Sequence, residues 1–323
     1  MRRLVLSITL ALAFCAPGAF AKKLNAPPEA REGLRLMYAG DTPRAIELFR
    51  KVQQAQPENP MGYLLEVNAL WWRMYCAACE IKWNTIDAFK RGKLPEDDHY
   101  FELADKAIAL GDAQLAKSPS AEMNLYVGMG YALKARLYGL RMEAKPVARA
   151  GVKAREYLLR AAQLDPELGD AYTGLGLYNY FVDALSWWAK MLRFFMGIPG
   201  GTKKEGMRLL ERALREGDMS VGEARFYYAK NLRNYDQNYA RAVELLTPLV
   251  EEYPTNPIFQ LVLGDMHAKL GHHAQAAKYF QAAQKLASHG TGGGLGSNSA
   301  CSTRIQQVAA GALALLPRSA VGN

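Results

Sequence analysis

The sequence contains few cysteines and histidines, and after its first 21 residues it has no hydrophobic run long enough to cross a bilayer. Four Cys and five His are spread over 323 residues. No serine nucleophile elbow, no Cys–His pair in a catalytic setting and no zinc-protease motif is present. His272 and His273 are adjacent, and His267 precedes them by five residues, which is not the i,i+4 spacing of a helical metal site. We therefore expect no enzyme activity, no cofactor and no metal.

The first 21 residues have the pattern of a secretory signal peptide. Arg2 and Arg3 precede an apolar run from Leu4 to Phe14, and Ala19-Phe20-Ala21 matches a small-x-small cleavage site. We expect cleavage after Ala21 and a periplasmic or secreted chain. A lipid anchor at Cys15 is the weaker alternative, because bulky Phe14 stands where such motifs have a small residue.

Three cysteines follow the signal, namely Cys76, Cys79 and Cys301, so at least one cannot pair within the chain. The stretch Cys76-Ala77-Ala78-Cys79 lacks the following His of a haem attachment site and lies in a helix-like run. The sequence favours two small buried residues one helical turn apart. A local disulfide and a redox or metal pair stay open as alternatives.

The chain is basic, with a net charge of +9 that becomes +7 when the two signal-peptide arginines are removed. Positive charge gathers between Lys134 and Arg160 and again between Lys190 and Arg215. In an exported protein we expect no nucleic-acid partner. An acidic protein surface, or peripheral contact with an anionic membrane, is the alternative to an ordinary solvated basic face.

A repeated pair of helices is the clearest pattern. Between Pro257 and Leu286, two apolar-periodic segments meet at Gly271, with small or aromatic residues at the contact steps Gly264, Ala276, Phe280 and Ala283. An Ala followed twelve residues later by a Pro recurs at Ala45–Pro57, Ala107–Pro119, Ala154–Pro166 and Ala242–Pro254. The Pro ends the second helix of each pair. This pattern resembles the tetratricopeptide repeat, a 34-residue helix-turn-helix unit.

We therefore predict an all-α fold, a tetratricopeptide-like α-solenoid of about six helix hairpins over residues 22–290, with no strand among them. Residues 26–59, 223–256 and 257–290 have the ordinary repeat length. The three central units are longer, which predicts about two added turns on each helix. Residues 291–323 should form a Gly/Ser-rich linker and a short C-terminal helix that caps the last repeat.

The resemblance implies that the first helices of the repeats line a concave face that binds a partner. The residues it places there are Asn68, Trp71, Met129, Leu177, Tyr180, Tyr227, Asn231, Asn234 and Asp265. Asn side chains can pair with an extended peptide backbone, and Tyr and Trp offer large contact area. Asn231 and Asn234, with Lys230 and Arg233, partly resemble the clamp by which some tetratricopeptide domains hold a carboxylate. The sequence favours the alternative, in which they are ordinary solvated polar residues of the inner face.

A second surface is the apolar insert from Ala184 to Ile198, which contains Trp187, Trp188, Phe194 and Phe195. These side chains are expected to pack on other long hairpins, or to line a cavity for an apolar ligand, or to touch a membrane. We expect a non-enzymatic scaffold that binds a protein or peptide in the bacterial periplasm or envelope. The alternative is an apolar small-molecule-binding accessory protein of a transport system, because long hairpins in an exported repeat chain also resemble the T-component proteins of TRAP transporters.

Overall fold

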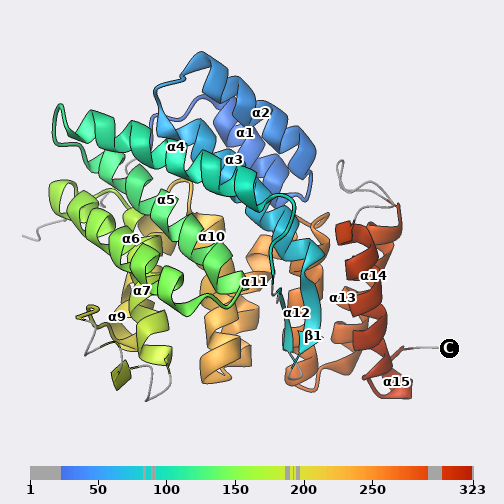
Figure 1. Cartoon of the computed structure of the whole chain (residues 1–323). Helices are drawn as coiled ribbons and strands as arrows, with labels where there is room; N and C mark the ends of the chain where they lie inside the picture. Colours follow the sequence, from blue (N-terminus) through green and yellow to red (C-terminus); the bar gives the residue numbers. More distant parts are fainter. Residues whose placement is uncertain are drawn as a thin grey trace, which may run out of the picture.

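The computed structural model describes residues 23–82, 85–88, 90, 92–185, 190–191, 193, 197–289 and 300–321. Nearly all of them lie in helices, which stack as antiparallel pairs (Figure 1). The elements are α1 Pro28–Tyr38, α2 Thr42–Ala55, α3 Pro60–Ala77, β1 Cys79–Lys82, β2 Thr85–Ala88, α4 Asp97–Leu115, α5 Ala121–Leu140, α6 Ala144–Leu164, α7 Ala171–Ala184, α9 Lys203–Glu216, α10 Val221–Asn231, η1 Leu232–Asp236, α11 Tyr239–Glu252, α12 Pro257–Lys269, α13 His273–His289, α14 Ala300–Ala314 and α15 Arg318–Val321.

Within the described residues six helix hairpins make up the stack, as the sequence predicts: α1/α2, α3/α4, α5/α6, α7/α9, α10–η1/α11 and α12/α13. The turns of the first and last hairpins pass through Gly40 and Gly271, whose φ angles are +92° and +75°. L-residues with a side chain rarely adopt that conformation, so glycine suits both turns. Between α12 and α13, Gly264 lies against the buried ring of Phe280, and Ala276 and Ala283 are fully buried beside it.

The three central units are longer than the others, but the extra residues take a different form in each. In the third unit both helices are long, with 20 residues in α5 and 21 in α6, as predicted. In the fourth unit α7 and α9 have only 14 residues each, and the excess lies in the connection between them. The second unit has long helices and, between them, an antiparallel β-hairpin of β1 and β2. Our expectation of helices alone missed this hairpin.

The ends of the stack come together. Asn256, at the start of α12, donates a side-chain hydrogen bond to the Tyr38 carbonyl at 2.9 Å, and Thr255 donates one to the Ala39 carbonyl at 2.7 Å. Arg31 of α1 forms an ion pair of 2.9 Å with Asp218, just before α10. The first unit therefore packs directly on the fifth and sixth units, and the inner side of the stack is closed by its own repeats.

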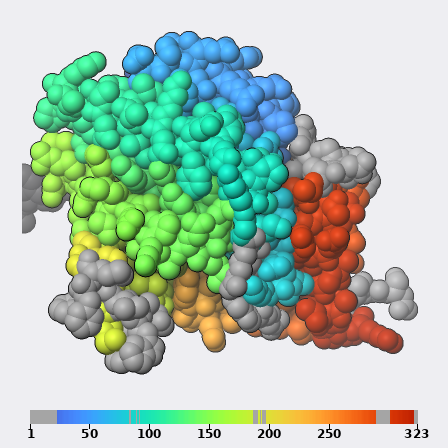
Figure 2. Space-filling view, viewed as in Figure 1, coloured from blue at the N-terminus to red at the C-terminus, as the bar shows by residue number. Residues whose placement is uncertain are grey.

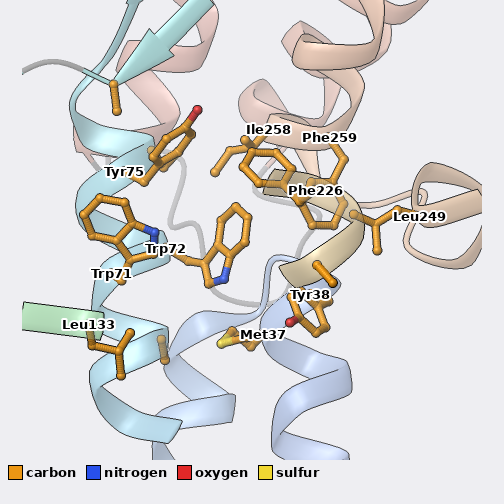
Figure 3. Close-up of a cluster of buried hydrophobic side chains, with 14 of the residues drawn as sticks. Met37, Tyr38, Trp71, Trp72, Tyr75, Leu133, Phe226, Leu249, Ile258 and Phe259 are labelled. Carbon is orange, nitrogen blue, oxygen red and sulfur yellow. The ribbon is translucent and has the colours of Figure 1, made fainter. Parts of the chain in front are cut away.

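Aromatic side chains fill the enclosed space (Figure 3). Trp72 of α3 meets Phe226 of α10 edge to face, with ring centroids 4.9 Å apart, and meets Phe259 of α12 at 5.5 Å. Tyr38 of α1 and Tyr75 of α3 flank these rings. Burying a large apolar side chain is worth about 1.5–3 kcal/mol, so this cluster is a main source of the stability that holds the closed stack.

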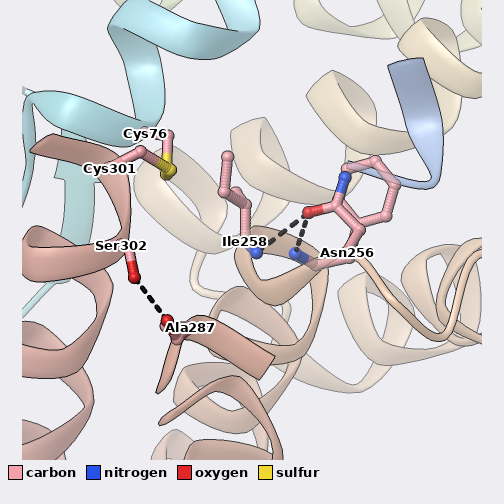
Figure 4. Close-up of a disulfide and its surroundings, with 7 residues drawn as sticks. Cys76, Asn256, Ile258, Ala287, Cys301 and Ser302 are labelled. Carbon is pink, nitrogen blue, oxygen red and sulfur yellow. Dashed lines mark hydrogen bonds between the residues drawn. A yellow bond between two sulfur atoms is a disulfide. The ribbon is translucent and has the colours of Figure 1, made fainter. Parts of the chain in front are cut away.

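A disulfide joins Cys76 at the end of α3 to Cys301 in α14, with their Cα atoms 5.0 Å apart (Figure 4). The interpretation of a local Cys76–Cys79 disulfide is therefore wrong, because Cys76 is already paired. The two residues are also not neighbours on one helix, since α3 ends at Ala77 and Cys79 begins β1 as a buried free thiol. The long-range partner was not foreseen, because sequence spacing carries no information on contacts 225 residues apart.

The C-terminal helix α14 packs on α13, α3 and β1 through a buried apolar face that includes Ile305, Val308 and Ala309. The residues of the expected signal peptide and the residues of the apolar insert named above, Trp187, Trp188, Phe194 and Phe195, lie outside the described residues. None of the helices in the described part of the chain has the length and apolar character needed to cross a membrane.

Candidate functional site

The structure places the predicted concave-face residues mostly inside the closed stack. Asn68, Trp71, Tyr180, Asn231 and Asp265 are buried. Met129 and Leu177 are half-buried and pack against the hydrophobic core. Tyr227 and Asn234 are also half-buried. Whether any of these residues binds a partner stays a prediction.

Two of them are linked to the β-hairpin: Asn234 hydrogen-bonds strand β2, and Asp265 pairs with Arg233, which bonds the same strand. The helix α10 continues into η1, a single turn of π-helix that ends at Gln237 in the left-handed conformation. A π-turn inserts an extra residue into a helix and is frequent at functional sites. Here it brings Arg233 and Asn234 to the side of the stack that faces strand β2.

Strand β2 is held by a group of side chains that we call the cradle, made of Tyr75, Lys230, Arg233 and Asn234. The Asp87 carboxylate accepts hydrogen bonds from Tyr75 Oη at 3.0 Å and from Asn234 Nδ2 at 3.1 Å. Lys230 Nζ lies 2.7 Å from the same carboxylate. These are the groups expected in a carboxylate-binding site, and the carboxylate in it belongs to the chain itself.

Arg233 connects this site to the rest of the stack. Its Nη2 donates to the Ile86 carbonyl at 2.7 Å, and its Nε lies 2.5 Å from the Asp265 carboxylate of α12. Its Nη1 donates to the Asn234 side chain at 3.0 Å, which orients that amide toward Asp87. The Arg233 guanidinium therefore binds the Ile86 carbonyl of β2. Tyr75, Lys230 and Asn234 bind the carboxylate of the next residue, Asp87.

The cradle is electrostatically matched to an anion. Burial by itself would raise the pKa of the Asp87 carboxyl, but the charges of Lys230 and Arg233 and the hydrogen bonds from Lys230 and the Ala88 N–H outweigh it, so this pKa lies below its ordinary value. Lys230 also lies over the ring of Tyr75, 5.0 Å from its centroid. Asp87 is thus held as a buried, ionised and hydrogen-bonded carboxylate.

A second network of side chains holds α10, the helix that carries Lys230 of the cradle. Trp71 Nε1 donates to the Tyr227 hydroxyl at 2.6 Å, and the Arg136 guanidinium lies over the Tyr227 ring at 4.6 Å. Arg136 in turn makes two hydrogen bonds to Glu223, at 2.5 and 2.8 Å. Because every member is packed and paired, α10 is fixed in place beneath the residues that bind β2.

Next to the cradle, two aromatic side chains reach solvent. Phe181 at the end of α7 and Tyr235 of η1 are 43% and 42% exposed, and their rings meet edge to face at 6.3 Å. Tyr180 lies beside Tyr235 and donates a hydrogen bond to Asp236, which also pairs with Lys203 of α9. This exposed aromatic pair borders the site that holds β2.

About half of the basic residues in the two stretches pair with acids, some on other elements and some on the same helix. Within the first stretch Lys134 pairs with Asp105, Arg136 with Glu223, Arg141 with Asp97 and Lys153 with Glu156. Within the second, ion pairs join Lys190 to Asp183, Lys203 to Asp236, Arg208 to Glu205 and Arg212 to Glu216. These pairs lower the charge that either stretch presents to an anionic surface.

A buried cysteine and two histidines, residue types that often act in catalysis or bind metals, lie in settings that favour neither role. Burial raises the pKa of the Cys79 thiol to about 12, which leaves almost no thiolate near neutral pH. The nearest ring nitrogens of His267 and His272 are 3.4 Å apart in the turn between α12 and α13. In the described part of the chain, three or more His, Cys, Asp or Glu residues do not come together as a metal site.

Sequence reasoning identified Lys230, Arg233 and Asn234 but missed what they bind. The signal was present in Glu80-Ile81-Lys82 and Thr85-Ile86-Asp87, where charged or polar residues alternate with isoleucine as in a half-buried strand. The tertiary contact between Asp87 and η1, 147 residues away, had no counterpart in the local pattern.

Comparison with known proteins supports the repeat. The family model of the tetratricopeptide repeat matches residues 235–291. The sequence has no significant match among curated proteins. Among solved structures, MamA is 17% identical over 62% of this chain and 98% of that chain, with a TM-score of 0.41. YrrB, a tetratricopeptide protein described as having an unusual peptide-binding site, is 15% identical over 81% and 99%, with a TM-score of 0.32. Yeast Tom70 is 10% identical over 88% and 73%, with a TM-score of 0.38.

The matched residues begin at the end of η1 and cover α11, α12 and α13, that is, the second helix of the fifth hairpin and the whole of the sixth. The Ala-to-Pro interval recurs along other hairpins, and the first hairpin turns at Gly40 as the last one turns at Gly271. The chain therefore contains tetratricopeptide repeats in residues 235–291, within a longer stack of helix hairpins.

Proposed function

We propose that this protein is a non-enzymatic scaffold that binds a partner protein through an extended segment, and that it works in the bacterial periplasm or envelope. The observation that carries the proposal is the cradle, which binds the Ile86 carbonyl and the Asp87 carboxylate of an extended strand. Main-chain pairing combined with a pocket for one side chain is a recurring way of recognising peptides.

The surface around the cradle supports the same role. Phe181 and Tyr235 expose apolar area next to polar groups that are already oriented. Aromatic residues in such positions are enriched where proteins bind one another, since they bury large area while few rotors are frozen. A partner is thus expected to cover this aromatic pair.

Site-specific photo-crosslinking in cells tests the proposal. A photo-reactive residue replaces Tyr235 in one variant, Phe181 in a second and Leu164 in a third; Leu164 has a matched exposure of 41% at the end of α6. We expect the same discrete crosslinked partner from Tyr235 and from Phe181, and not from Leu164. Equal crosslinking at all three positions, or none at Tyr235 and Phe181, contradicts the proposal.

The location rests on the sequence of residues 1–21 and has its own test. We expect the mature chain to begin at Lys22, which intact mass measurement of the purified protein checks. We expect the protein in the periplasmic fraction after osmotic shock. A chain that keeps residues 1–21 and fractionates with the cytoplasm contradicts this part of the proposal.

The other expectations stay predictions. The apolar-ligand alternative, with its resemblance to TRAP T-components, depends on Trp187, Trp188, Phe194 and Phe195, which lie outside the described residues. Peripheral contact with an anionic membrane would depend on the basic stretches, whose charge is reduced by the ion pairs described above.

A further inference from the structure

Strand β2 is bound to the cradle in the way that a ligand is bound. Two consecutive residues of the strand are bound. Arg233 binds the Ile86 carbonyl, and Lys230, Asn234 and Tyr75 bind the Asp87 carboxylate. The groups that bind them come from α3 and from α10–η1. The strand also buries Ile86 and Ala88 in the hydrophobic core, but the residue between them is charged and is bound by polar groups.

The charges at the cradle call for an anion. With β2 in place, Lys230 and Arg233 face the two carboxylates of Asp87 and Asp265. Without Asp87, two cations face only Asp265, and the Asn234 amide and the Tyr75 hydroxyl lose the acceptor they share. Leaving such groups unpaired in a buried site is costly, so the cradle has a strong preference for a carboxylate.

One edge of the site, at Lys230 and Asn234, borders solvent, while Tyr75, Arg233 and Asp87 are buried. Figure 2 shows atoms of the hairpin region (cyan) at the molecular surface beside α14 (red), which β1 contacts. The Lys230 side chain is 17% exposed, and Asn234 is half-buried. The exposed pair Phe181 and Tyr235 lies on the adjoining surface.

We propose that β2 is an internal ligand, and that the partner binds by replacing it with an extended segment in which an apolar residue is followed by aspartate. This inference rests on the proposed function and names the partner's recognition element and its competitor. An aspartate within the segment fits better than a chain terminus, because Asp87 Oδ1 also accepts the N–H of the following Ala88 at 2.8 Å. A C-terminal carboxylate has no following N–H to donate.

The test uses the chain's own strand in trans. The probe is a synthetic peptide with the sequence of residues 84–90, and the matched control peptide has Asn in place of the Asp. Both are titrated into the full mature chain with its disulfide intact, as wild type and as Asp87→Asn, which keeps the side-chain shape and removes the internal charge. Circular dichroism and intact mass confirm that each variant is folded and oxidised.

We expect Asp87→Asn to bind the Asp peptide at least tenfold more tightly than wild type does, because the internal competitor is weakened. We expect it to prefer the Asp peptide to the Asn peptide by at least tenfold. Adding Lys230→Ala should abolish that preference. A folded Asp87→Asn chain that binds both peptides equally, or binds neither, overturns the inference.

A measurement on the wild-type chain covers the case in which Asp87→Asn does not fold. Hydrogen exchange of the β2 amides is followed at saturating peptide. We expect faster exchange with the Asp peptide and no change with the Asn peptide, since only the former displaces the strand. Unchanged exchange with the Asp peptide bound overturns the inference.

The result is separable from the proposed function. If Tyr235 and Phe181 crosslink a partner while the peptide never displaces β2, the scaffold role stands and β2 is a permanent part of the fold. If the peptide displaces β2 and no partner crosslinks, the recognition site stands and the assignment of the docking surface fails.

Discussion

The side-chain amide of Asn256 donates a hydrogen bond of 2.9 Å to the carbonyl of Tyr38, although the two residues are 218 positions apart. The same side chain accepts the N–H groups of Ile258 and Phe259 and so caps the start of α12. One residue thus begins the last repeat and attaches it to the first. This link is one of those that close the inner face of the stack, and the proposed recognition site lies at the edge where the β-hairpin lies.

Replacing Asn256 with Ala should destabilise the chain more than a cap alone explains. Loss of an N-cap costs about 1 kcal/mol, and the Tyr38 carbonyl loses a partner in a buried site, which adds about 1–3 kcal/mol. Asn59 is the matched control, because it also caps a helix that begins with Pro and has no such link to another repeat. Urea denaturation measures both variants, and equal losses contradict the closing role of Asn256.

Replacing Gly264 with Ala should destabilise the last hairpin. A Cβ atom there would lie 2.8 Å from two ring atoms of Phe280, which is fully buried. Such overpacking costs about 1–3 kcal/mol. Gly151 in the middle of α6 is the control, since the nearest atom to its Cβ, on Tyr178, is 3.9 Å away. Gly151→Ala should instead stabilise by about 0.5–1 kcal/mol in thermal or urea unfolding.

Breaking the disulfide should destabilise the chain strongly. Cys76 and Cys301 close a loop of 225 residues, and the chain-entropy model assigns about 5 kcal/mol to a link of that length. Cys301→Ala should therefore cost far more than Cys79→Ala, which removes an equally buried sulfur without breaking a link. Guanidinium unfolding under non-reducing conditions compares the two. Similar midpoints would show that the link contributes little.

The thiol of Cys79 should be inert in the native chain. With a pKa of about 12, only about one part in ten thousand is thiolate at pH 8. A thiol reagent should label Cys79 slowly under native conditions and at the ordinary rate in denaturant. Fast native labelling of Cys79 would show that the β1 segment opens readily.

The ion pairs of Asp87 should make stability depend on pH in the acid range. The folded pKa of this carboxyl lies below the ordinary 3.8, so the folded state binds fewer protons than the unfolded state as pH falls through that range. The stabilisation is complete above the unfolded pKa and is lost as pH falls through the folded pKa. Asp87→Asn should be less stable at neutral pH and lose less stability below about pH 4. Parallel acid limbs for both proteins would contradict this.

Much of the fold follows from local pattern. The small residues at Gly264, Ala276 and Ala283 determine where two helices touch, because only small side chains let backbones approach. The recurring Ala-to-Pro interval determines where second helices end, since proline cannot continue a helix. Because these two signals are local, the sequence predicts the number of hairpins and the ordinary length of the terminal repeats.

Only one half of the candidate site, its binding side chains, could be predicted from the sequence. Lys230, Arg233 and Asn234 stand in one short stretch, so their grouping is local and visible. Their partner Asp87 and the pairing of Cys76 with Cys301 depend on how the stack curves, which is the sum of many small packing angles and has no local signature. The sequence alone therefore determined a repeated stack of helix pairs with a polar cluster near its end. The tertiary structure decided that the stack closes on itself and that the cluster is occupied by the chain's own strand, because these outcomes require residues from distant repeats to meet.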